Sequence, residues 1–572
     1  MNDINTLYEQ WLKSAVADED LIPELESIKG DEEAILDRFY KNLEFGTAGL
    51  RGVIGAGTNR MNVYTVNQAT QGLADYLNEN FEEPSIAIAY DSRIKSEEFA
   101  KSAAGVLAAN GIKVYIYPEL VPTPMLSFAV RRLGCSSGII ITASHNPSKY
   151  NGYKCYDPNG YQMTDEAAAK TYEYIQNIDM FSGVKTMDFD DALAEDMIDF
   201  IEDWLVDEFY EKVLACCVNP ADIKKAGLKV VYTPLNGTGN KPVRKILKKA
   251  GIKDVTIVKE QEKPDGNFPT CPYPNPEIRQ AFECAIKTAE GTDTDLLLAT
   301  DPDCDRVGIA VRDGDDYVLM SGNEVGAMLC EYLLSTLKEQ GKLPENPIVV
   351  KTIVTTPLVE TIASAYGAET ADLLTGFKYI GELVTNLEKT GEENRFIVGM
   401  EESYGYLRGA HARDKDAVVA SLIICEMAAY YKLRGISLKQ FMDDIYEKYG
   451  MYLNSVLNFA FEGASGMQKM SDIMSSLRTN APKEIAGKKV VTVADYKLSV
   501  VKDIVTGEET EITLPKSNVL SYSLEDNSKV IVRPSGTEPK IKAYITAYGV
   551  SRAESEAKTE VMSKSISKIL GV

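Results

Sequence analysis

The chain has 572 residues and a net charge of −24, because 61 Lys and Arg residues face 85 Asp and Glu residues. At about 100–200 residues per domain, this length predicts three or four domains. An acidic surface repels phosphate backbones and anionic lipids, so we expect neither a nucleic acid nor a membrane as a partner. Only two histidines are present, so a metal site would be built chiefly from carboxylates, which favours a hard cation such as Mg²⁺.

The N-terminal segment is polar, with Ile4, Leu7 and Trp11 at helical spacing, and it lacks the apolar stretch of a signal peptide. No apolar run in the sequence approaches the ~18 residues that span a bilayer. The nine cysteines include no C-x-x-C motif. These features predict a cytoplasmic protein whose thiols are reduced.

Up to about residue 430, the sequence repeats one pattern, in which a short β-branched run ends in a polar motif and a helical stretch follows. Such alternation predicts parallel sheets covered by helices on both faces, with ligands beyond the carboxyl ends of the strands. The pattern restarts near 206–230 and 316–348, which predicts three α/β modules. The runs with their motifs lie at 85–93, 137–147, 228–239, 295–306, 348–357 and 395–406.

The last stretch changes character. Segments 488–497, 517–535 and 539–549 read as alternating strands, and Ala553, Ala557, Val561 and Ile569 mark the face of a closing helix. We therefore predict an α/β protein of three similar α/β modules followed by an α+β C-terminal domain. The predicted domains are residues 1–205, 206–317, 318–452 and 453–572.

The glycine-rich segment 45–52 is neither a Walker A loop nor a dinucleotide fingerprint, because the required lysine and strand-to-helix context are missing. Thr142-Ala143-Ser144-His145-Asn146-Pro147 is more informative, because its Asn-Pro turn would present the Ser144 hydroxyl at a strand's carboxyl end. Such a serine can act as a nucleophile if a base or a metal activates it. A plain turn is the alternative, and His145 either joins the site or bonds to the backbone. Lys154 follows as a cation for phosphate or proton handling.

The Gly237-Thr238-Gly239 segment is interpreted as a structural turn. Asp301, Asp303 and Asp305 directly follow an apolar run, and in an extended segment their carboxylates would share one side. Three such carboxylates repel one another unless a cation neutralises them, so we predict a metal site that leaves room for a phosphate. An EF-hand loop is excluded, because its required glycine and glutamate are replaced by Arg306 and Arg312.

Two later loops complete the set. Glu401 and Ser403 lie on one loop and suit the hydroxyls of a sugar, although an exposed loop is an equal interpretation. Segment 533–539 combines an arginine, two hydroxyls and a glycine, which predicts an anion cradle more readily than a simple turn.

The motifs TASHNP, DPDCDR, EESYG and RPSGTEP, in this order and one per module, resemble the α-D-phosphohexomutase family over essentially the entire chain. FGTAGLRG and the segment 375–378 are most similar to its phosphoglucomutase-2-like branch. Two positions depart from the common pattern, at MEESYG and at Ala417, and bear on the choice of sugar rather than on the chemistry. The resemblance implies four domains with mixed sheets around a central cleft.

The resemblance also implies roles for individual residues. Ser144 would be the phosphoserine and a metal ligand together with Asp301, Asp303 and Asp305. The other catalytic residues would be Lys154, Arg306, Arg51 and His145, and those binding substrate would be Glu401, Ser403, Lys378, Arg533, Ser535, Gly536 and Thr537.

The implied activity is the interconversion of glucose 1-phosphate and glucose 6-phosphate, through a phosphoserine and a glucose 1,6-bisphosphate that also serves as activator. Mg²⁺ is the implied cofactor, and the enzyme would be a monomer or dimer whose partners are sugar phosphates. A phosphomannomutase, a phosphopentomutase, a sugar phosphatase that uses the same serine and metal, and a non-catalytic sugar-phosphate binder remain alternatives.

Overall fold

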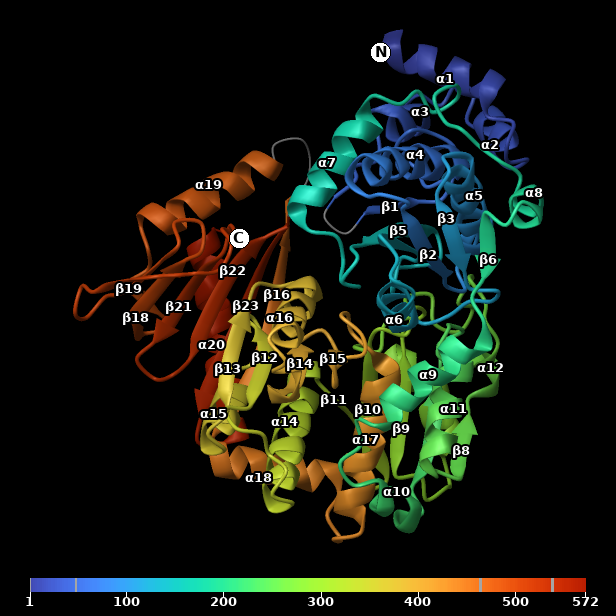
Figure 1. Cartoon of the computed structure of the whole chain (residues 1–572). Helices are drawn as coiled ribbons and strands as arrows, with labels where there is room; N and C mark the ends of the chain where they lie inside the picture. The colour runs from blue at the N-terminus through green and yellow to red at the C-terminus, as the bar shows by residue number, and fades with distance from the viewer. Residues whose placement is uncertain (1, 47–48, 462–465, 536–539, 572) are drawn as a thin grey trace. The chain divides into compact units, whose positions relative to one another are not determined.

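The computed structural model describes residues 2–46, 49–461, 466–535 and 540–571. The chain forms two compact units (Figure 1). Unit 1 comprises residues 1–322, 377–399 and 403–437, and unit 2 comprises residues 323–376, 400–402 and 438–572. The predicted α/β class with a β-rich C-terminal part is confirmed, whereas the finer boundaries of four domains stay a prediction. No helix in the described ranges is long and apolar enough to cross a membrane.

Unit 1 is built around two mixed sheets. The first has the order β1-β5-β4-β2-β3-β6, with β2 parallel to its neighbours β3 and β4 and with β5 antiparallel to β4. The second has the order β11-β10-β9-β7-β8. The strands are β1 (Leu50–Val53), β2 (Ser85–Tyr90), β3 (Lys113–Ile116), β4 (Ser137–Ile141), β5 (Tyr150–Tyr156), β6 (Ile198–Phe200), β7 (Lys229–Thr233), β8 (Asp254–Ile257), β9 (Leu296–Thr300), β10 (Val307–Asp313), β11 (Asp316–Met320), β14 (Phe396–Glu401, ending in unit 2) and β15 (Gly405–Leu407).

Helices cover both faces of the first sheet, as the sequence pattern predicts. Helices α5 and α6 both contact β2 and β4, and Figure 1 shows them on opposite sides of the sheet. The helices of unit 1 are α1 (Asn2–Ser14), α2 (Leu21–Ser27), α3 (Glu32–Phe39), α4 (Val63–Asn80), α5 (Ser96–Ala109), α6 (Thr123–Leu133), α7 (Asp165–Gln176), α8 (Phe189–Ala194), α9 (Asp203–Leu214), α10 (Pro220–Ala226), α11 (Asn240–Ala250), α12 (Lys259–Glu262), α13 (Glu283–Ala289), α16 (Phe377–Lys389) and α17 (Ala417–Lys432), with short 3₁₀ turns at Arg279–Phe282 and Glu393–Arg395.

Local sequence explains where these elements start and what they bury. Asn62 and Thr65 form a reciprocal capping box at the start of α4, which satisfies amide groups that would otherwise lack partners. The central strands β4 and β9 are buried along their whole length, as expected for strands covered on both faces. The predicted N-terminal helix is confirmed as α1, and its Trp11 is fully buried in a cluster with Tyr8 and Phe39.

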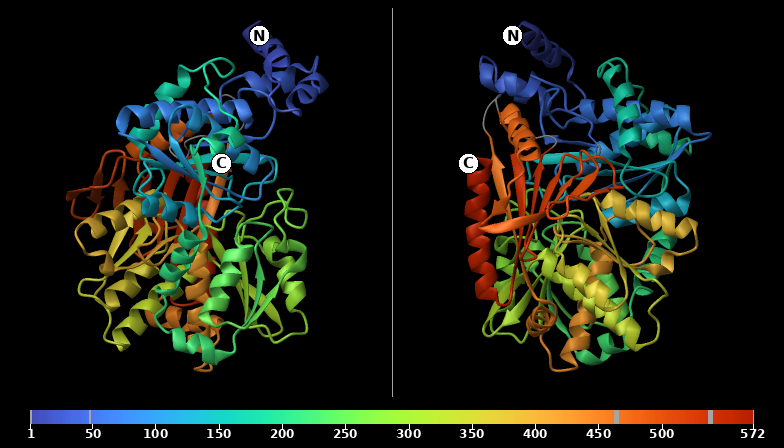
Figure 2. Two further views of the ribbon diagram at one scale, coloured as in Figure 1. Left: turned by 45° about the vertical axis from the view of Figure 1, so that its right-hand side comes forward. Right: turned by 90° about the vertical axis from the view of Figure 1, so that its left-hand side faces the viewer.

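Unit 2 contains a parallel pair of strands, β12 and β13, and a large sheet in the order β16-β23-β22-β21-β18-β19-β20. Helices α19 and α20 both contact β23, and Figure 2 shows α20 running along the sheet. The elements are α14 (Gly322–Glu339, starting at the end of unit 1), β12 (Ile348–Thr352), α15 (Leu358–Ala365), β13 (Glu369–Leu373), α18 (Leu438–Tyr449), β16 (Met451–Ala460), α19 (Gly466–Thr479), β17 (Glu484–Ile485), β18 (Lys488–Asp495), β19 (Val500–Asp503), β20 (Glu509–Glu511), β21 (Leu520–Leu524), β22 (Lys529–Pro534), β23 (Lys540–Gly549) and α20 (Arg552–Leu570).

The closing helix is confirmed as an element, but of the four residues that mark its spacing only Ile569 packs, partly buried, against the core. Ala553, Ala557 and Val561 are exposed, and the helix instead buries Ser555, Met562, Ile566 and Leu570. Met562, Ile566 and Leu570 join the core of the large sheet. Small and β-branched residues can occupy an exposed helix face, so an apolar spacing built on alanines is a weak guide to burial.

Candidate active site

Ser144 lies just beyond the carboxyl end of β4, as predicted. Its backbone is in the left-handed region, with φ of 51°, and its side chain is buried. A non-glycine residue in this region is strained by about 1 kcal/mol or more, so the surrounding structure must hold it. The Thr142 hydroxyl accepts a hydrogen bond from the Ser144 amide at 2.8 Å. The turn therefore presents the Ser144 hydroxyl in one fixed direction.

Arg93 stabilises this turn through hydrogen bonds to its backbone. Its guanidinium donates to the backbone carbonyls of Ser144, Asn146, Pro147 and Tyr150. The same group lies 5.0 Å from the centre of the Phe268 ring. Since one fully buried arginine satisfies four carbonyls of a strained loop, its role is to position Ser144 rather than to contact a substrate.

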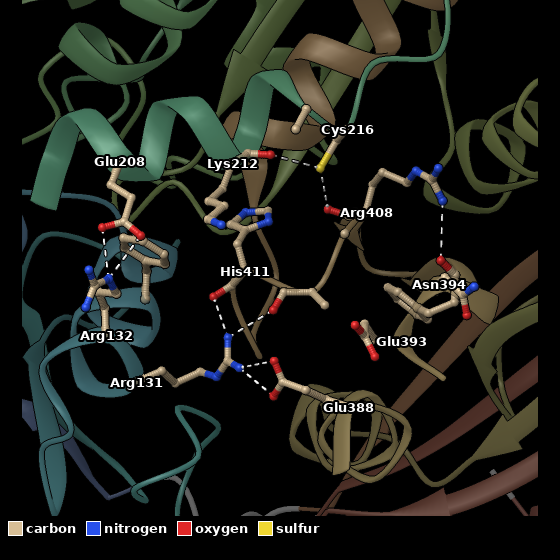
Figure 3. Close-up of a pocket in the computed structure, with 15 residues that line it drawn as sticks. Arg131, Arg132, Glu208, Lys212, Cys216, Glu388, Glu393, Asn394, Arg408 and His411 are labelled. Atoms are coloured by element: carbon tan, nitrogen blue, oxygen red, sulfur yellow. Dashed lines mark hydrogen bonds and ion pairs between the residues drawn. The ribbon is translucent and has the colours of Figure 1, made fainter. Parts of the chain in front are cut away.

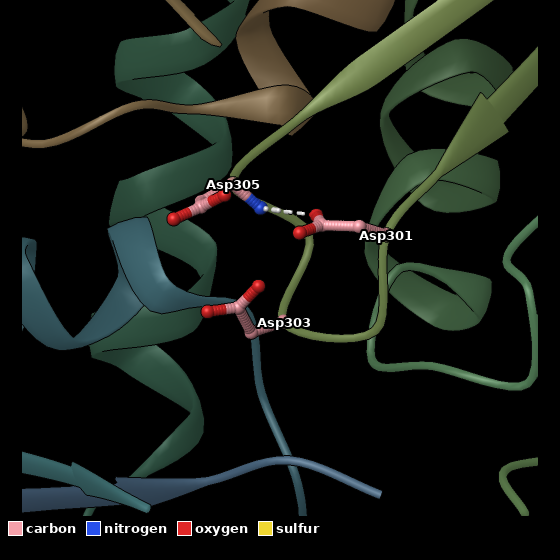
Figure 4. Close-up of side chains that lie close together, drawn as sticks. All are labelled: Asp301, Asp303 and Asp305. Carbon is pink, nitrogen blue, oxygen red and sulfur yellow. Dashed lines mark hydrogen bonds between the residues drawn. The ribbon is translucent and has the colours of Figure 1, made fainter. Parts of the chain in front are cut away.

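Asp301, Asp303 and Asp305 converge, but not in the way that their spacing suggested. Residues 301–305 form a tight turn between β9 and β10 rather than an extended segment, and Cys304 has a left-handed φ of 52°. The Asp301 carboxylate accepts hydrogen bonds from the amides of Asp305, at 3.1 Å, and Arg306, at 3.0 Å, which closes the turn. Each aspartate offers an oxygen within 4.8 Å of the others (Figure 4). The prediction of convergence is confirmed, and the prediction of an extended backbone is wrong because these amide contacts curl the loop.

The serine and the aspartate triplet are in direct contact. The Ser144 hydroxyl donates to Asp301 Oδ2 at 2.8 Å, and its oxygen lies 3.1 Å from His145 Nδ1. Lys154, on β5, donates to Asp303 Oδ2 at 2.8 Å and lies 3.6 Å from Asp305 Oδ2. The strand pairing explains this approach, since Lys154 lies opposite Ile140 on β4.

The triplet has unused oxygen atoms that fit a cation. All three aspartates are buried, and Asp303 Oδ1 and Asp305 Oδ1 have no hydrogen-bond partner within the described part of the chain. Leaving a charged oxygen buried and unpaired is strongly unfavourable. Carboxylate oxygens are also the ligands that Mg²⁺ prefers. The residues present therefore fit a hard divalent cation, with open positions for further oxygen ligands.

The electrostatics of the site reflect the same excess of negative charge. Burial and the neighbouring carboxylates raise the pKa of Asp301 well above its usual range. Burial alone would also raise the pKa of Asp303, but the Lys154 ammonium outweighs it and lowers this pKa. Burial tends to lower the pKa of Lys154, but Asp303 and Asp305 outweigh it, so that pKa is raised and the amine stays protonated.

A second lysine, which the sequence reasoning did not select, approaches the triplet from another segment. Lys415 Nζ lies 3.2 Å from Asp305 Oδ2 and 3.1 Å from Asp414 Oδ1. Its stem passes against Gly405, where a Cβ atom would lie 2.2 Å from Lys415 Cδ. Any larger residue at 405 would push the lysine off the aspartate, so the glycine makes room for the ion pair.

The remaining predicted catalytic residues of unit 1 lie around this centre. Burial, followed by the charges of Arg306 and Arg51, lowers the pKa of His145 well below its usual value, so its imidazole is neutral. Arg306 pairs with Glu277 at 3.1 Å, and its Nε lies 3.8 Å from Asp305 Oδ1. Arg51, on β1, is exposed opposite Gly152 of β5. These positions agree with cations placed to meet a phosphate.

The predicted sugar-binding residues make contacts within the protein that do not by themselves indicate a sugar site. Lys378, at the start of α16, forms an ion pair with Asp165. Glu401 ends β14 and accepts a hydrogen bond from the Gly376 amide at 3.0 Å. Ser403 is partly buried. Their roles toward a sugar stay predictions.

The predicted anion cradle lies in unit 2. Arg533 is on β22, opposite Lys542 of β23, and the Ser535 amide donates to the Lys540 carbonyl at 2.7 Å. Gly536 and Thr537 lie outside the described residues. The cradle therefore also stays a prediction.

Several residues that build the site were missed. Asp91 and Arg93 directly follow β2, which is parallel to β4. Thr123 begins α6, and Thr123 Oγ1 donates to Asp303 Oδ2 at 3.1 Å. Gly237 was interpreted as a plain turn, but a Cβ there would lie 2.4 Å from Pro302 Cα, so it lets two loops pack. The strand-end rule that selected Ser144 applies equally to Asp91-Ser92-Arg93 and could have found that pair. Nothing local in the sequence indicates Thr123 or Lys415.

Family models match three successive stretches of the chain between residues 42 and 449. The three α/β/α domains of phosphoglucomutase/phosphomannomutase match residues 42–181, 207–314 and 321–449, as domains I, II and III.

Among curated relatives, a phosphoglucomutase of Staphylococcus saprophyticus is 38% identical over 94% of this chain and 95% of its own length. A phosphoglucomutase of Staphylococcus aureus is 36% identical over the same shares. Two solved structures share the fold. A putative phosphomannomutase from Thermus thermophilus has a TM-score of 0.69 at 21% identity, covering 93% of this chain and 100% of its own. Parafusin, a phosphoglucomutase from Paramecium, has 0.70 at 18%, covering 93% and 96%.

Proposed function

We propose that this chain, which belongs to the phosphoglucomutase/phosphomannomutase family, interconverts glucose 1-phosphate and glucose 6-phosphate. The observation that carries the proposal is the contact between Ser144 and Asp301 at 2.8 Å, beside two further carboxylates with unused oxygens. The names of the full-length relatives favour glucose over mannose or ribose as the sugar.

In the proposed reaction, Ser144 stores a phosphoryl group and passes it to the free hydroxyl of a hexose monophosphate. The resulting glucose 1,6-bisphosphate reorients and returns its other phosphoryl group to Ser144. Such transfer needs in-line positioning and cationic stabilisation more than covalent work by the protein. The strained Ser144 turn, fastened by Arg93, supplies the positioning.

Asp301, Asp303 and Asp305 would hold Mg²⁺, which supplies charge neutralisation for the phosphoryl group when bound. Lys154, protonated because of its paired carboxylates, adds a fixed positive charge at the same place. Arg306 and Arg51 provide further cations near His145. In the proposed scheme, Arg533 and Ser535 bind the phosphate that is not reacting.

Proton handling at Ser144 follows from its two neighbours. When the bisphosphate returns a phosphoryl group, the hydroxyl proton must leave, and the two nearby acceptors are Asp301 Oδ2, at 2.8 Å, and His145 Nδ1, at 3.1 Å. His145 is neutral, so its ring can accept a hydrogen bond or a proton.

The proposal is tested by incubating the full-length protein with Mg²⁺, glucose 1-phosphate and a trace of glucose 1,6-bisphosphate, and measuring glucose 6-phosphate. Parallel reactions with mannose 1-phosphate and ribose 1-phosphate compare kcat/KM among sugars, and free phosphate is measured in each. We expect glucose to be preferred, with almost no phosphate released. A Ser144→Ala variant should be inactive, whereas Ser148→Ala, in the same loop, should keep wild-type turnover. Activity only on mannose or ribose, or stoichiometric phosphate release, would contradict the assignment.

A further inference from the structure

The three aspartates of the metal-binding turn are each held by the protein mainly through one carboxylate oxygen. Asp301 Oδ1 accepts hydrogen bonds from two backbone amides of the turn. Asp303 Oδ2 accepts from Lys154 at 2.8 Å, and Asp305 Oδ2 lies 3.2 Å from Lys415 Nζ. The other oxygens of Asp303 and Asp305, both Oδ1, have no hydrogen-bond partner among the described residues. The turn therefore keeps one oxygen of each of these two carboxylates available for a cation.

Two carboxylates elsewhere in unit 1 are bound at both oxygens instead. In a pocket between α6, α9 and α16, Arg131 donates to both oxygens of Glu388, and Arg132 donates to both oxygens of Glu208 (Figure 3). Such a fork satisfies the whole carboxylate within the protein. The contrast shows that the aspartate turn holds its carboxylates in a way that leaves room for a further ligand.

Thr123 contributes most directly to the orientation of Asp303. It is fully buried at the first position of α6. Its Oγ1 donates to Asp303 Oδ2 at 3.1 Å, the oxygen that also accepts from Lys154. The Thr123 amide donates to the Asp303 carbonyl at 2.9 Å. Thr123 thus fixes both the backbone and the carboxylate of Asp303, with Oδ1 as the free oxygen.

The number of free oxygens matters because divalent cations differ in what they require of a carboxylate. Ca²⁺ takes roughly 6–8 oxygen ligands in flexible geometry and often binds both oxygens of one carboxylate, whereas Mg²⁺ is smaller and demands near-ideal octahedral geometry. For both oxygens of Asp303 to bind a cation, Oδ2 would have to lose its contacts with Thr123 and Lys154. These contacts therefore disfavour the larger cation.

We propose that Thr123 is a positioning residue that sets the cation selectivity of the aspartate triplet. By occupying Oδ2, it restricts Asp303 to one ligand oxygen and so favours Mg²⁺ over Ca²⁺. Lys154 shares this oxygen through a flexible stem, whereas Thr123 is also fixed to the Asp303 backbone. The inference rests on the proposed function in one respect, since both require a divalent cation at the triplet.

The proposal is tested by measuring cation binding to the full-length protein without sugar phosphate. Mn²⁺ binding is followed by electron paramagnetic resonance, and Mg²⁺ and Ca²⁺ are each titrated as competitors, which gives the ratio of their dissociation constants. Thr123→Val keeps the shape of the side chain and removes the donor. We expect its affinity for Mg²⁺ to fall by about tenfold and its affinity for Ca²⁺ to fall less, so that the preference for Mg²⁺ shrinks. Thr123→Ser retains the hydroxyl and should keep the wild-type preference.

Two further variants separate selectivity from general damage to the fold. Thr171→Val is a matched control, because Thr171 is equally buried and its hydroxyl donates to the Ala167 carbonyl of its own helix, so both affinities should stay unchanged. Thr123→Ala also lacks the hydroxyl and should reproduce the ratio of Thr123→Val, which removes any dependence on how one variant packs. Equal losses of Mg²⁺ and Ca²⁺ affinity in Thr123→Val would overturn the proposal, since they would show a structural role alone.

The inference and the proposed function fail in different ways. Mn²⁺ binding that is absent in the wild type, or that survives in Asp303→Asn, would overturn both, because the triplet would not hold the cation. Mutase activity and Mn²⁺ binding at the triplet, combined with an unchanged ratio in Thr123→Val, would overturn the inference and leave the proposed function standing.

Discussion

The molecule has two buried clusters of lysines and carboxylates, which differ in how many positive charges face the negative ones. In unit 2, Lys351 is fully buried and lies 2.7 Å from Glu360 Oε1 and 2.6 Å from Asp372 Oδ1, both contacts being ion pairs without hydrogen-bond geometry. Burial tends to raise the pKa of both carboxylates; the Lys351 charge outweighs it at Glu360, whose pKa is lowered, whereas the pKa of Asp372 is raised. Lys529 adds a second positive charge that acts on both. Two cations thus face two carboxylates.

The aspartate triplet of unit 1 is not balanced in this way. Lys154, Lys415 and Arg306, whose Nε lies 3.8 Å from Asp305 Oδ1, face three carboxylates of the triplet and Asp414 besides. Two carboxylate oxygens of the triplet have no hydrogen-bond partner in the described ranges. A balanced cluster can be sufficient for structure alone, whereas uncompensated carboxylates indicate a missing cation. The difference teaches that the balance of charge, rather than burial, separates a functional cluster from a structural one.

The largest expected effect distinguishes the two clusters by activity. Asp303→Asn removes one metal ligand and the main partner of Lys154, so kcat/KM should fall by about 10³-fold or more. Asp372→Asn removes a carboxylate from the balanced cluster and should change kcat/KM by no more than severalfold. Equal losses of kcat/KM in both variants would contradict the claim that only the aspartate triplet takes part in the reaction.

A single buried pair gives the next test, through the pH dependence of stability. The pKa of His411 is raised to about 9 in the folded protein, above its ordinary value of about 6.5 when unfolded. Its pairing with Asp416 therefore stabilises the fold fully below about pH 6.5, and this contribution is lost as the pH rises toward 9.

The corresponding loss is up to about 3 kcal/mol in the free energy of unfolding, measured by urea denaturation between these pH values. His411→Gln should flatten the profile. A profile of the variant that still falls as steeply would show that other groups cause it.

Magnesium should stabilise only the protein with an intact triplet. At a free concentration of about 100 times Kd, binding raises the free energy of unfolding by about 2.7 kcal/mol, seen as a higher Tm. Asp303→Asn should lose this shift, and Asp372→Asn should retain it. A shift that survives in Asp303→Asn would place the metal elsewhere.

The balanced cluster should matter for stability instead. Lys351→Met leaves Glu360 and Asp372 with Lys529 as their remaining shared cation. That charge and the partial exposure of the carboxylates limit the loss to about 2 kcal/mol in urea denaturation. Lys497→Met, at an exposed position of the same unit, should stay within about 0.5 kcal/mol of the wild type. If the two variants unfold alike, the cluster is not structural.

The smallest effect concerns how the aspartate turn is supported. Gly237→Ala would place a Cβ 2.4 Å from Pro302 Cα, so the turn must shift and its affinity for Mn²⁺ should fall severalfold. Gly291→Ala, where no atom lies within 4 Å, serves as a control for the general effect of the substitution, although its φ of 69° makes it locally strained. Equal Mn²⁺ affinities would show that the turn does not depend on this packing.

Much of this architecture could be predicted from strand ends. Ser144 and Asp301 were found because each directly follows a buried strand, and both sit where that rule places them. The predictions that failed depended on hydrogen bonds that a pattern of residue types does not show. The turn at 301–305 is curled by amide groups that donate to Asp301, which no alternation pattern contains.

Lys415 and Thr123 show why the site could not be completed from sequence. Lys415 reaches Asp305 across 110 positions, and Thr123 reaches Asp303 across 180. Both are ordinary residues in their local context, and only the fold gives them a partner. The residues that α20 buries were missed for a related reason, since burial is decided by the sheet that it packs on.

The most direct test asks whether Ser144 carries the phosphoryl group beside the aspartates. The protein is incubated with Mg²⁺ and glucose 1,6-bisphosphate, digested, and analysed by mass spectrometry of the peptide that contains Ser144, before and after glucose 6-phosphate is added. The account predicts a single phosphoryl group on Ser144 that the sugar phosphate removes, and none in Asp303→Asn on the same timescale. A label on another residue, or a label on Ser144 that the sugar cannot discharge, would contradict it.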